Sequence, residues 1–176
     1  FSAYYGVQTQ RAINNFKISN HKLSDYKEFI KALAVVKLGA AQANYKLGLL
    51  RDEVFKAIEF ACNELINGKY TEQFPIDMIQ GGAGTSVNMN ANEVIANRAN
   101  EIAGKKICHP NDDINMSQSS NDTFPTALHI SAVCVIEDKL IPAIDTLVET
   151  FKRLEKENEG IVKSGRTHLQ DAVPIS

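Results

Sequence analysis

The sequence predicts an all-α protein, with an N-terminal helical domain over residues 1–114 followed by the first long helices of a helical bundle over residues 115–176. Two observations predict this class. Apolar residues recur at spacings of three and four in several stretches, as on a helix with one buried face. No stretch shows the alternation of apolar and polar residues that is typical of a half-buried strand.

The first helices are expected in the N-terminal half. Residues 1–27 show little periodicity and are expected to be irregular. A helix is predicted from Phe29 to Gly48, because its apolar residues share a face and glycine commonly ends a helix. A second helix is predicted to begin at Asp52, a suitable N-cap, and to end with the Asn-Gly pair at residues 67–68.

A third helix is predicted from Thr85 or Ser86 to Ala103, with Gly104 behind it. It contains five asparagines, although the amide of asparagine competes with the helix for backbone groups. Two interpretations stay open, namely buried amides that satisfy neighbouring backbone or a polar wall beside a ligand. The asparagines are Asn88, Asn90, Asn92, Asn97 and Asn100.

A polar connection over residues 105–118 precedes a long helical stretch of about 35 residues, which corresponds to roughly 50 Å of helix. Pro125 is expected in its first turn, where the missing N–H costs no hydrogen bond. Pro142 lies inside the pattern and is expected to kink the helix or divide it in two. A helix of this length is typical of a bundle.

Composition excludes two classes of partner. The 19 Lys and Arg and the 21 Asp and Glu give a net charge of −2, so no basic surface for a nucleic acid is expected. No apolar run reaches the length of about 18 residues that a membrane-spanning helix needs.

The three cysteines are far apart and fit neither a disulfide framework nor a zinc motif, so we expect a reducing, cytoplasmic setting. The first residue is Phe1 rather than Met, and we expect a piece of a longer protein, with a removed targeting segment left open.

Three segments place small residues and hydroxyl or amide side chains beside an expected helix start or turn. They are GGAGTS at 81–86, SQSSND at 117–122 and GRTHLQD at 165–171. Glycines let backbone N–H groups approach a ligand, and a helix N-terminus carries free donors and about half a positive charge. None of the segments contains a metal-ligand cluster or a cysteine nucleophile, so we expect a site that binds a small anion without a metal or an organic cofactor.

Each segment also has a structural interpretation. The first can be a plain turn with Thr85 or Ser86 as a cap, and it lacks the lysine of a Walker pattern and the third glycine of a dinucleotide site. The second contains more hydrogen-bonding side chains than one cap needs, which favours a ligand as much as a cap. His168 can orient a substrate, pass a proton or lie in a core. No convincing general base is present, which indicates a base outside this chain.

Taken together, these segments resemble the fumarase/aspartase superfamily. The match is an ordered set along nearly the whole chain, which reads YYGVQT at 4–9, GGAGTSVNMNANE at 81–93, SQSSNDTFP at 117–125 and GRTHLQDAVP at 165–174. The first glycine-rich segment and Val173 resemble aspartases, whereas HPNDD at 109–113 and SQSSNDT resemble class II fumarases. The resemblance implies a lyase whose full-length form reversibly eliminates ammonia from L-aspartate to give fumarate through an aci-carboxylate intermediate. A class II fumarate hydratase and a catalytically silent family member are the alternatives.

The resemblance also implies site residues. His168 would orient the substrate or relay a proton, while the general base, a Ser on a Gly-Ser-Ser loop, would lie outside this chain. The substrate-binding residues implied are Thr85, Ser119, Ser120, Asn121, Thr167 and His168. A second anion site, for which a plain polar loop is an equally good interpretation, is implied at His109, Asn111 and Asp112.

The resemblance further implies partners. Family members are homotetramers with a central helical bundle, and three subunits contribute to each active site. The implied ligand is a small dicarboxylate, with no nucleic acid and no membrane as partner. The chain alone would therefore be inactive and would expose apolar helix faces.

Overall fold

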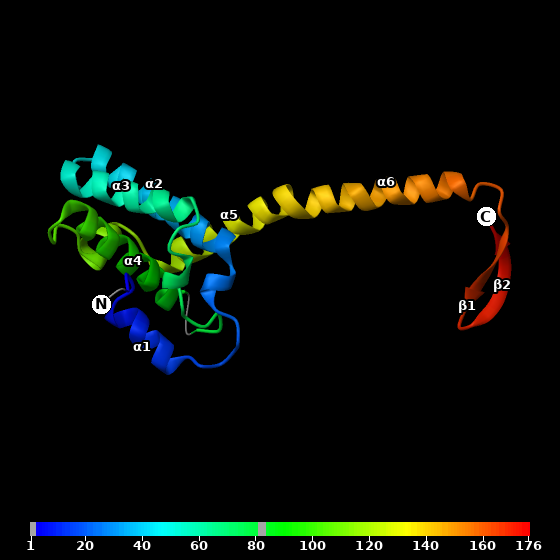
Figure 1. The fold of residues 1–176 in the computed structure, drawn as a ribbon, viewed down its shortest axis with the longest axis horizontal. Coiled ribbons are helices and arrows are strands. Elements are labelled where there is room, and N and C mark those ends of the chain that lie inside the picture. Colours follow the sequence, from blue (N-terminus) through cyan, green and yellow to red (C-terminus); the bar gives the residue numbers. More distant parts are fainter. Residues whose placement is uncertain (1–2, 81–83) are drawn as a thin grey trace. The chain divides into compact units, whose positions relative to one another are not determined.

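The computed structural model describes residues 3–80 and 84–176, and these are mostly helical (Figure 1). The all-α class expected from the sequence is confirmed, with one small two-stranded sheet in the described residues. Contacts within the chain divide it into two units, Phe1–Cys134 and Val135–Ser176. The domain boundary after residue 114 stays a prediction. Within the described residues, no helix combines the length and the apolar character that crossing a membrane requires.

In its described residues, the first unit contains five helices and three short turns. The helices are α1 (Val7–Asn15), α2 (Lys27–Lys46), α3 (Asp52–Ile66), α4 (Thr85–Ala103) and most of α5 (Ser120–Val135). The turns are η1 (Leu23–Asp25), η2 (Thr71–Gln73) and the π-helical η3 (Pro110–Ile114). The structure therefore confirms the helices predicted after Phe29, after Asp52 and after Thr85.

The core of this unit lies among α2, α3 and α4, which pack against one another. Leu33 of α2, Ile58 of α3 and Ile95 of α4 are fully buried. Burial of each such side chain contributes roughly 1.5–3 kcal/mol to folding. These contacts hold α4 in place, and α4 carries the first of the three candidate segments.

The expectation of an irregular segment over residues 1–27 is wrong at α1. Glu93 of α4 is buried and accepts hydrogen bonds from three backbone N–H groups at the start of α1, at 2.8–3.0 Å, and from the Thr9 hydroxyl at 2.7 Å. A carboxylate in this position satisfies N–H groups that a helix leaves free and interacts favourably with the helix dipole. The helix thus depends on a residue far away in the sequence, which local periodicity cannot reveal.

The two prolines of the long stretch lie at different places in their helices. Pro125 does not lie in the first turn as expected, because α5 begins at Ser120 and the proline is inside it. The Asn121 carbonyl therefore has no N–H of residue 125 to accept. Near Pro142, where the sequence predicted a kink or a division, the helix changes to the π-helical turn η4 (Ile136–Leu140) and continues as α6 (Ile141–Glu157), with Pro142 in the first turn of α6. This is the position where a proline costs least.

The second unit consists of η4, α6 and an antiparallel hairpin of β1 (Lys163–Thr167) and β2 (Gln170–Ile175). These strands were not expected from the sequence. Nearly all their residues are exposed, so they lack the alternating pattern that burial of one face imposes. The hairpin depends instead on backbone pairing and on the turn between the strands.

Candidate active site

The N-terminus of α4 lies against α5. Gly84 precedes Thr85 and has a φ of +84°, and a Cβ atom built on it would lie 2.1 Å from Cγ of Phe124. Only glycine permits both this left-handed conformation and this close approach. Residues 81–83, the start of the first candidate segment, lie outside the described residues. Thr85 is the first residue of the helix and is exposed.

The start of α5 contains the second candidate segment. Ser119 is exposed, and its Oγ atom accepts a hydrogen bond from the Asn121 backbone N–H at 3.2 Å. Its carbonyl accepts from the N–H groups of Asp122 and Thr123. Ser119 thus acts as a cap, as its structural interpretation predicts. The Ser120 side chain is half-buried and has a different partner, on α4.

Asn88 of α4 connects the two helix starts. Its Nδ2 atom donates to Ser120 Oγ at 3.0 Å, and its Oδ1 atom accepts from Thr123 Oγ1 at 3.1 Å. Thr85 and Asn88 are three residues apart, so they share a face of α4. The structure therefore brings Thr85 to the same region as Ser119, Ser120 and Asn121. Two adjacent helix N-termini with hydroxyl groups suit an anion, because both dipoles point their positive ends to it.

The five asparagines of α4 divide between the two interpretations. Backbone groups are the partners of Asn90, Asn97 and Asn100. Asn88 and Asn92 instead both donate to the Oδ1 atom of Asn115, at 2.9 and 3.2 Å. Among the hydrogen bonds described for the five asparagines, that of Asn88 to Ser120 alone reaches a candidate substrate-binding residue.

A buried lysine lies behind this region. Lys37 of α2 is 1% exposed, and its Nζ atom donates to Asn115 Oδ1 at 3.2 Å and to Gln118 Oε1 at 3.0 Å. Both acceptors are neutral amides. Burial therefore lowers the pKa of Lys37 to about 7, while the nearby Cys62 opposes this shift. The amino group of Lys37 thus lies beneath Asn115 and not at the surface.

The sequence prediction missed both Lys37 and Asn88 as candidate site residues. One signal for Lys37 was available, because it lies four residues after Leu33 and four before Ala41, and all three are buried on one face of α2. The apolar residues that predict this helix instead indicate a face that ends at Leu47, which is 73% exposed; they are Phe29, Leu33, Val36, Ala40, Ala43 and Leu47. That set counts apolar residues only, so it leaves out Lys37, a polar residue on the buried face of α2.

Thr167 and His168 belong to the hairpin of the second unit. Thr167 pairs with Gln170, and the two turn residues, His168 and Leu169, have φ values of +48° and +63°. Positive φ at both positions is typical of a type I′ hairpin turn, which Gly and Asn favour and Leu does not. His168 is exposed, and Leu169 is 93% exposed. The substrate-binding roles of Thr167 and His168 stay predictions.

The proposed second anion site lies on the turn η3. His109 Nδ1 accepts from the Asp112 N–H at 3.3 Å and lies 3.1 Å from the Asp112 carboxylate, and the His109 N–H donates to Asp113 at 2.7 Å. Asn111 is exposed in the same turn. The turn thus brings the expected residues together, with the Asp113 carboxylate accepting from the His109 backbone and the Asp112 carboxylate beside the imidazole. The anion site therefore stays a prediction.

Comparison with known proteins identifies the family. A lyase family model matches residues 1–176. The chain is 53% identical to fumarate hydratase class II of Campylobacter jejuni, over 98% of this chain and 38% of the relative. It is 51% identical to aspartate ammonia-lyase of Pseudomonas aeruginosa, over 99% of this chain and 38% of the relative.

A solved structure has the same fold. The fumarate lyase:delta crystallin from Brucella melitensis superposes with a TM-score of 0.92 and 47% identity, over 99% of this chain and 40% of that one. The present chain thus spans about 38% of the length of the curated relatives compared above. The match along its whole length shows that the chain belongs to the lyase family that contains these proteins, the fumarase/aspartase superfamily.

Proposed function

We propose that the full-length protein is an aspartate ammonia-lyase, which eliminates ammonia from L-aspartate to give fumarate. The observation that supports this most directly is the meeting of two helix N-termini, where Thr85 and Ser119 are exposed and Ser120 is held by Asn88. A class II fumarate hydratase is the second candidate, because a relative of that name is 53% identical. Both reactions require the same chemistry at the carbon next to a carboxylate.

The chemistry explains why hydroxyl groups suit this reaction. Removal of a proton next to a carboxylate gives an aci-carboxylate dianion, and its formation is fast only where donors already point at the developing charge. In our proposal, Thr85, Ser119 and Ser120 bind this carboxylate, and Asn121 and His168 lie near the leaving amine. Thr167 binds or orients the substrate with His168. The base is supplied by a part of the protein outside this chain.

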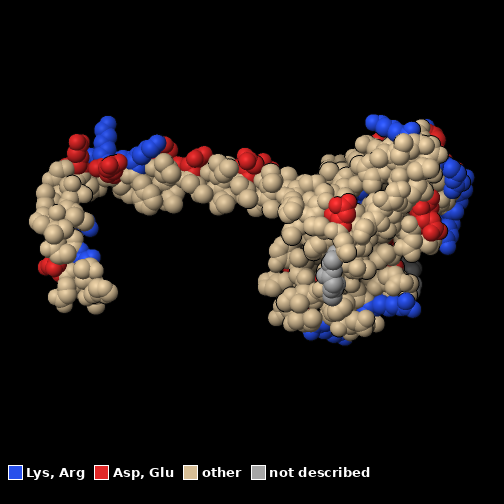
Figure 2. Space-filling model, turned by 180° about the vertical axis from the view of Figure 1, so that it is seen from behind, with Lys and Arg blue, Asp and Glu red and all other residues tan. Residues whose placement is uncertain are grey.

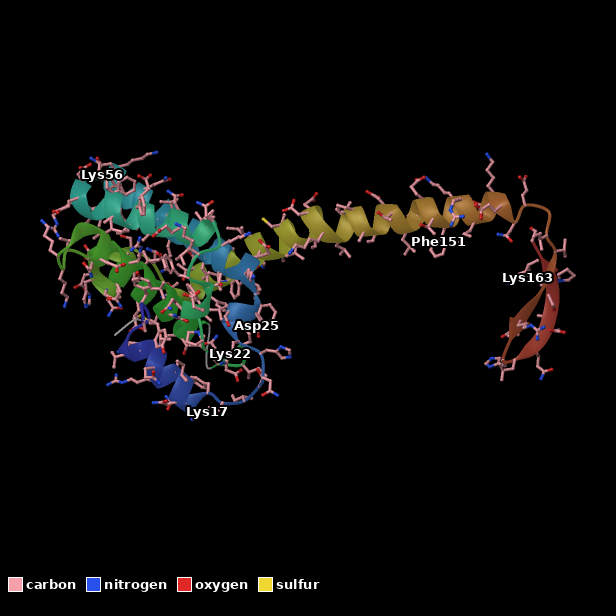
Figure 3. All side chains as sticks on the ribbon, viewed as in Figure 1. Lys17, Lys22, Asp25, Lys56, Phe151 and Lys163 are labelled. Carbon is pink, nitrogen blue, oxygen red and sulfur yellow. The ribbon has the colours of Figure 1, made fainter. Side chains whose placement is uncertain are left out.

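We further propose a homotetramer in which three subunits contribute to each site. The exposed apolar face of α6 supports this, since Ile144, Leu147 and Phe151 are 48–60% exposed. Charged residues gather along the other side of this helix (Figure 2), and the Phe151 side chain projects from it (Figure 3). An apolar face of this extent requires partner helices to cover it.

The test follows the ultraviolet absorbance of fumarate with the full-length protein. Growth of absorbance from L-aspartate supports the ammonia-lyase, and growth from L-malate alone supports the hydratase. No change with either substrate indicates a catalytically silent protein and refutes both reactions. Replacement of Ser120 by alanine should lower kcat/KM at least tenfold, because a lost donor often costs about 3 kcal/mol in the transition state. Unchanged kinetics would remove Ser120 from the site.

A further inference from the structure

The Ser120 hydroxyl belongs to a chain of hydrogen bonds that begins at a buried lysine. Lys37 Nζ donates to Asn115 Oδ1, and the same oxygen accepts from Asn88 Nδ2 at 2.9 Å. Asn88 Nδ2 then donates to Ser120 Oγ. Each of these groups is partly or fully buried, so water does not readily replace the bonds.

Contacts with the backbone fix the directions of the bonds in this chain. Asn115 Nδ2 donates to the Gln118 carbonyl at 3.2 Å, so Asn115 turns its Oδ1 atom to Lys37. Gln118 agrees with this, because its Nε2 atom donates to the carbonyls of Ile114 and Met116 at 2.7 and 3.1 Å. With its oxygen fixed, Asn115 can only accept from the amide nitrogen of Asn88.

The opposite end of Asn88 faces a buried hydroxyl group. Thr123 Oγ1 lies 3.1 Å from Asn88 Oδ1 and 3.1 Å from the Ser119 carbonyl, and its one proton is shared between these two acceptors. The contact with Asn115 therefore decides the orientation of the Asn88 amide, and the Thr123 hydroxyl supports it, so the amide presents its nitrogen to Ser120. Ser120 Oγ accepts from this nitrogen, so the hydroxyl proton of Ser120 is directed away from Asn88.

We propose that Asn88, oriented by Asn115 and Thr123, is a positioning residue that makes Ser120 a hydrogen-bond donor to the substrate carboxylate. This inference rests on the proposed function of the site. A serine hydroxyl that donated to Asn88 would present only lone pairs to the substrate, and these repel a carboxylate. The network therefore selects the one orientation that binds an anion.

A double-mutant cycle in the full-length protein separates positioning from structural support. Asn88→Ala and Thr123→Val are each made alone and together with Ser120→Ala, and the affinity for succinate is measured by calorimetry beside kcat/KM for fumarate formation. If Asn88 acts through Ser120, Asn88→Ala weakens succinate binding and kcat/KM by roughly tenfold or more in the native background and by less than about twofold beside Ser120→Ala. Thr123→Val, which keeps the side-chain shape, changes both in the same direction and keeps the test available if Asn88→Ala does not assemble.

Asn100→Ala is the matched control. Asn100 is on the same helix and makes three hydrogen bonds, all to the backbone of Ile107 and Cys108. This variant should lower the unfolding temperature and leave succinate affinity unchanged. If Asn88→Ala and Thr123→Val each lower succinate affinity and kcat/KM as much beside Ser120→Ala as in the native background, the inference is overturned. A native protein that binds succinate but forms no fumarate refutes the proposed reaction alone, because the cycle is still measured by succinate affinity, and a protein that does not bind succinate overturns both.

Discussion

Replacing Gly84 by alanine tests how closely the starts of α4 and α5 must approach. Gly84 and Gly104 flank α4 and both have positive φ, +84° and +66°. A Cβ at Gly84 would meet the Phe124 side chain at 2.1–2.4 Å, whereas at Gly104 nothing lies within 4 Å. The pair therefore separates the cost of the backbone conformation from the cost of the contact.

The expected magnitudes follow from these two terms. Alanine in a left-handed conformation costs about 1–2 kcal/mol, and this is the whole expected effect of Gly104→Ala. Gly84→Ala adds an overpacking cost of about 1–3 kcal/mol, because the ring of Phe124 must move. That movement shifts α5 relative to Thr85, so fumarate formation should also fall. Gly104→Ala should keep its kcat/KM.

The assay compares unfolding temperature and kcat/KM for the two variants of the full-length protein. Gly84→Ala should unfold at the lower temperature and lose activity, while Gly104→Ala loses stability alone. Equal unfolding temperatures and equal activities would refute the argument that Gly84 is needed for the approach of the two helices.

Further predictions concern the core, the N-terminus and the apolar face. Burial lowers the pKa of Lys37 from 10.5 to about 7, so between these values the unfolded chain holds a proton that the folded chain has lost. The free energy of unfolding of the native protein should therefore rise with pH above about 7, by up to about 1.4 kcal/mol per pH unit relative to Lys37→Met. Urea unfolding of both proteins across pH 7–9 measures this, and an equal pH dependence of the two would contradict it. Glu93→Gln should cost about 1–3 kcal/mol and speed proteolysis near α1, since it leaves a buried N–H group without its acceptor, and unchanged protection of α1 would count against that role. Residues 1–176 produced alone should self-associate through the face of α6, and a monodisperse monomer in light scattering would contradict this.

The sequence was sufficient where local signals decide the structure. The spacing of apolar residues predicted the helices after Phe29, Asp52 and Thr85, and Pro142 marked the place where the long stretch becomes irregular. Each of these depends on residues within one or two turns of helix. Motif order along the chain was also sufficient for the family, because several short segments had to match together.

The remaining features depend on contacts between distant residues. The helix α1 requires Glu93, more than 80 residues further on, and the hairpin strands pair without burying a face. The role of Asn88 was hidden for the same reason, since five asparagines in one helix are equivalent until their partners are known. Ser119 and Ser120 also looked alike in the sequence, yet one caps α5 and the other bonds to α4.

The position of Lys37 has a consequence for how the proposed site could favour the transition state. A lysine in direct contact with the substrate would bind the dicarboxylate before and after reaction about equally, which lowers KM without raising kcat. In this structure Lys37 Nζ instead donates to the Asn115 oxygen, and Asn115 and Asn88 connect it to the Ser120 hydroxyl. A fixed hydroxyl donor stabilises the carboxylate most strongly when that carboxylate acquires its second negative charge, because the donor need not reorganise at that moment. We therefore expect Lys37→Met to lower kcat more than it raises KM, whereas direct binding by Lys37 would raise KM first.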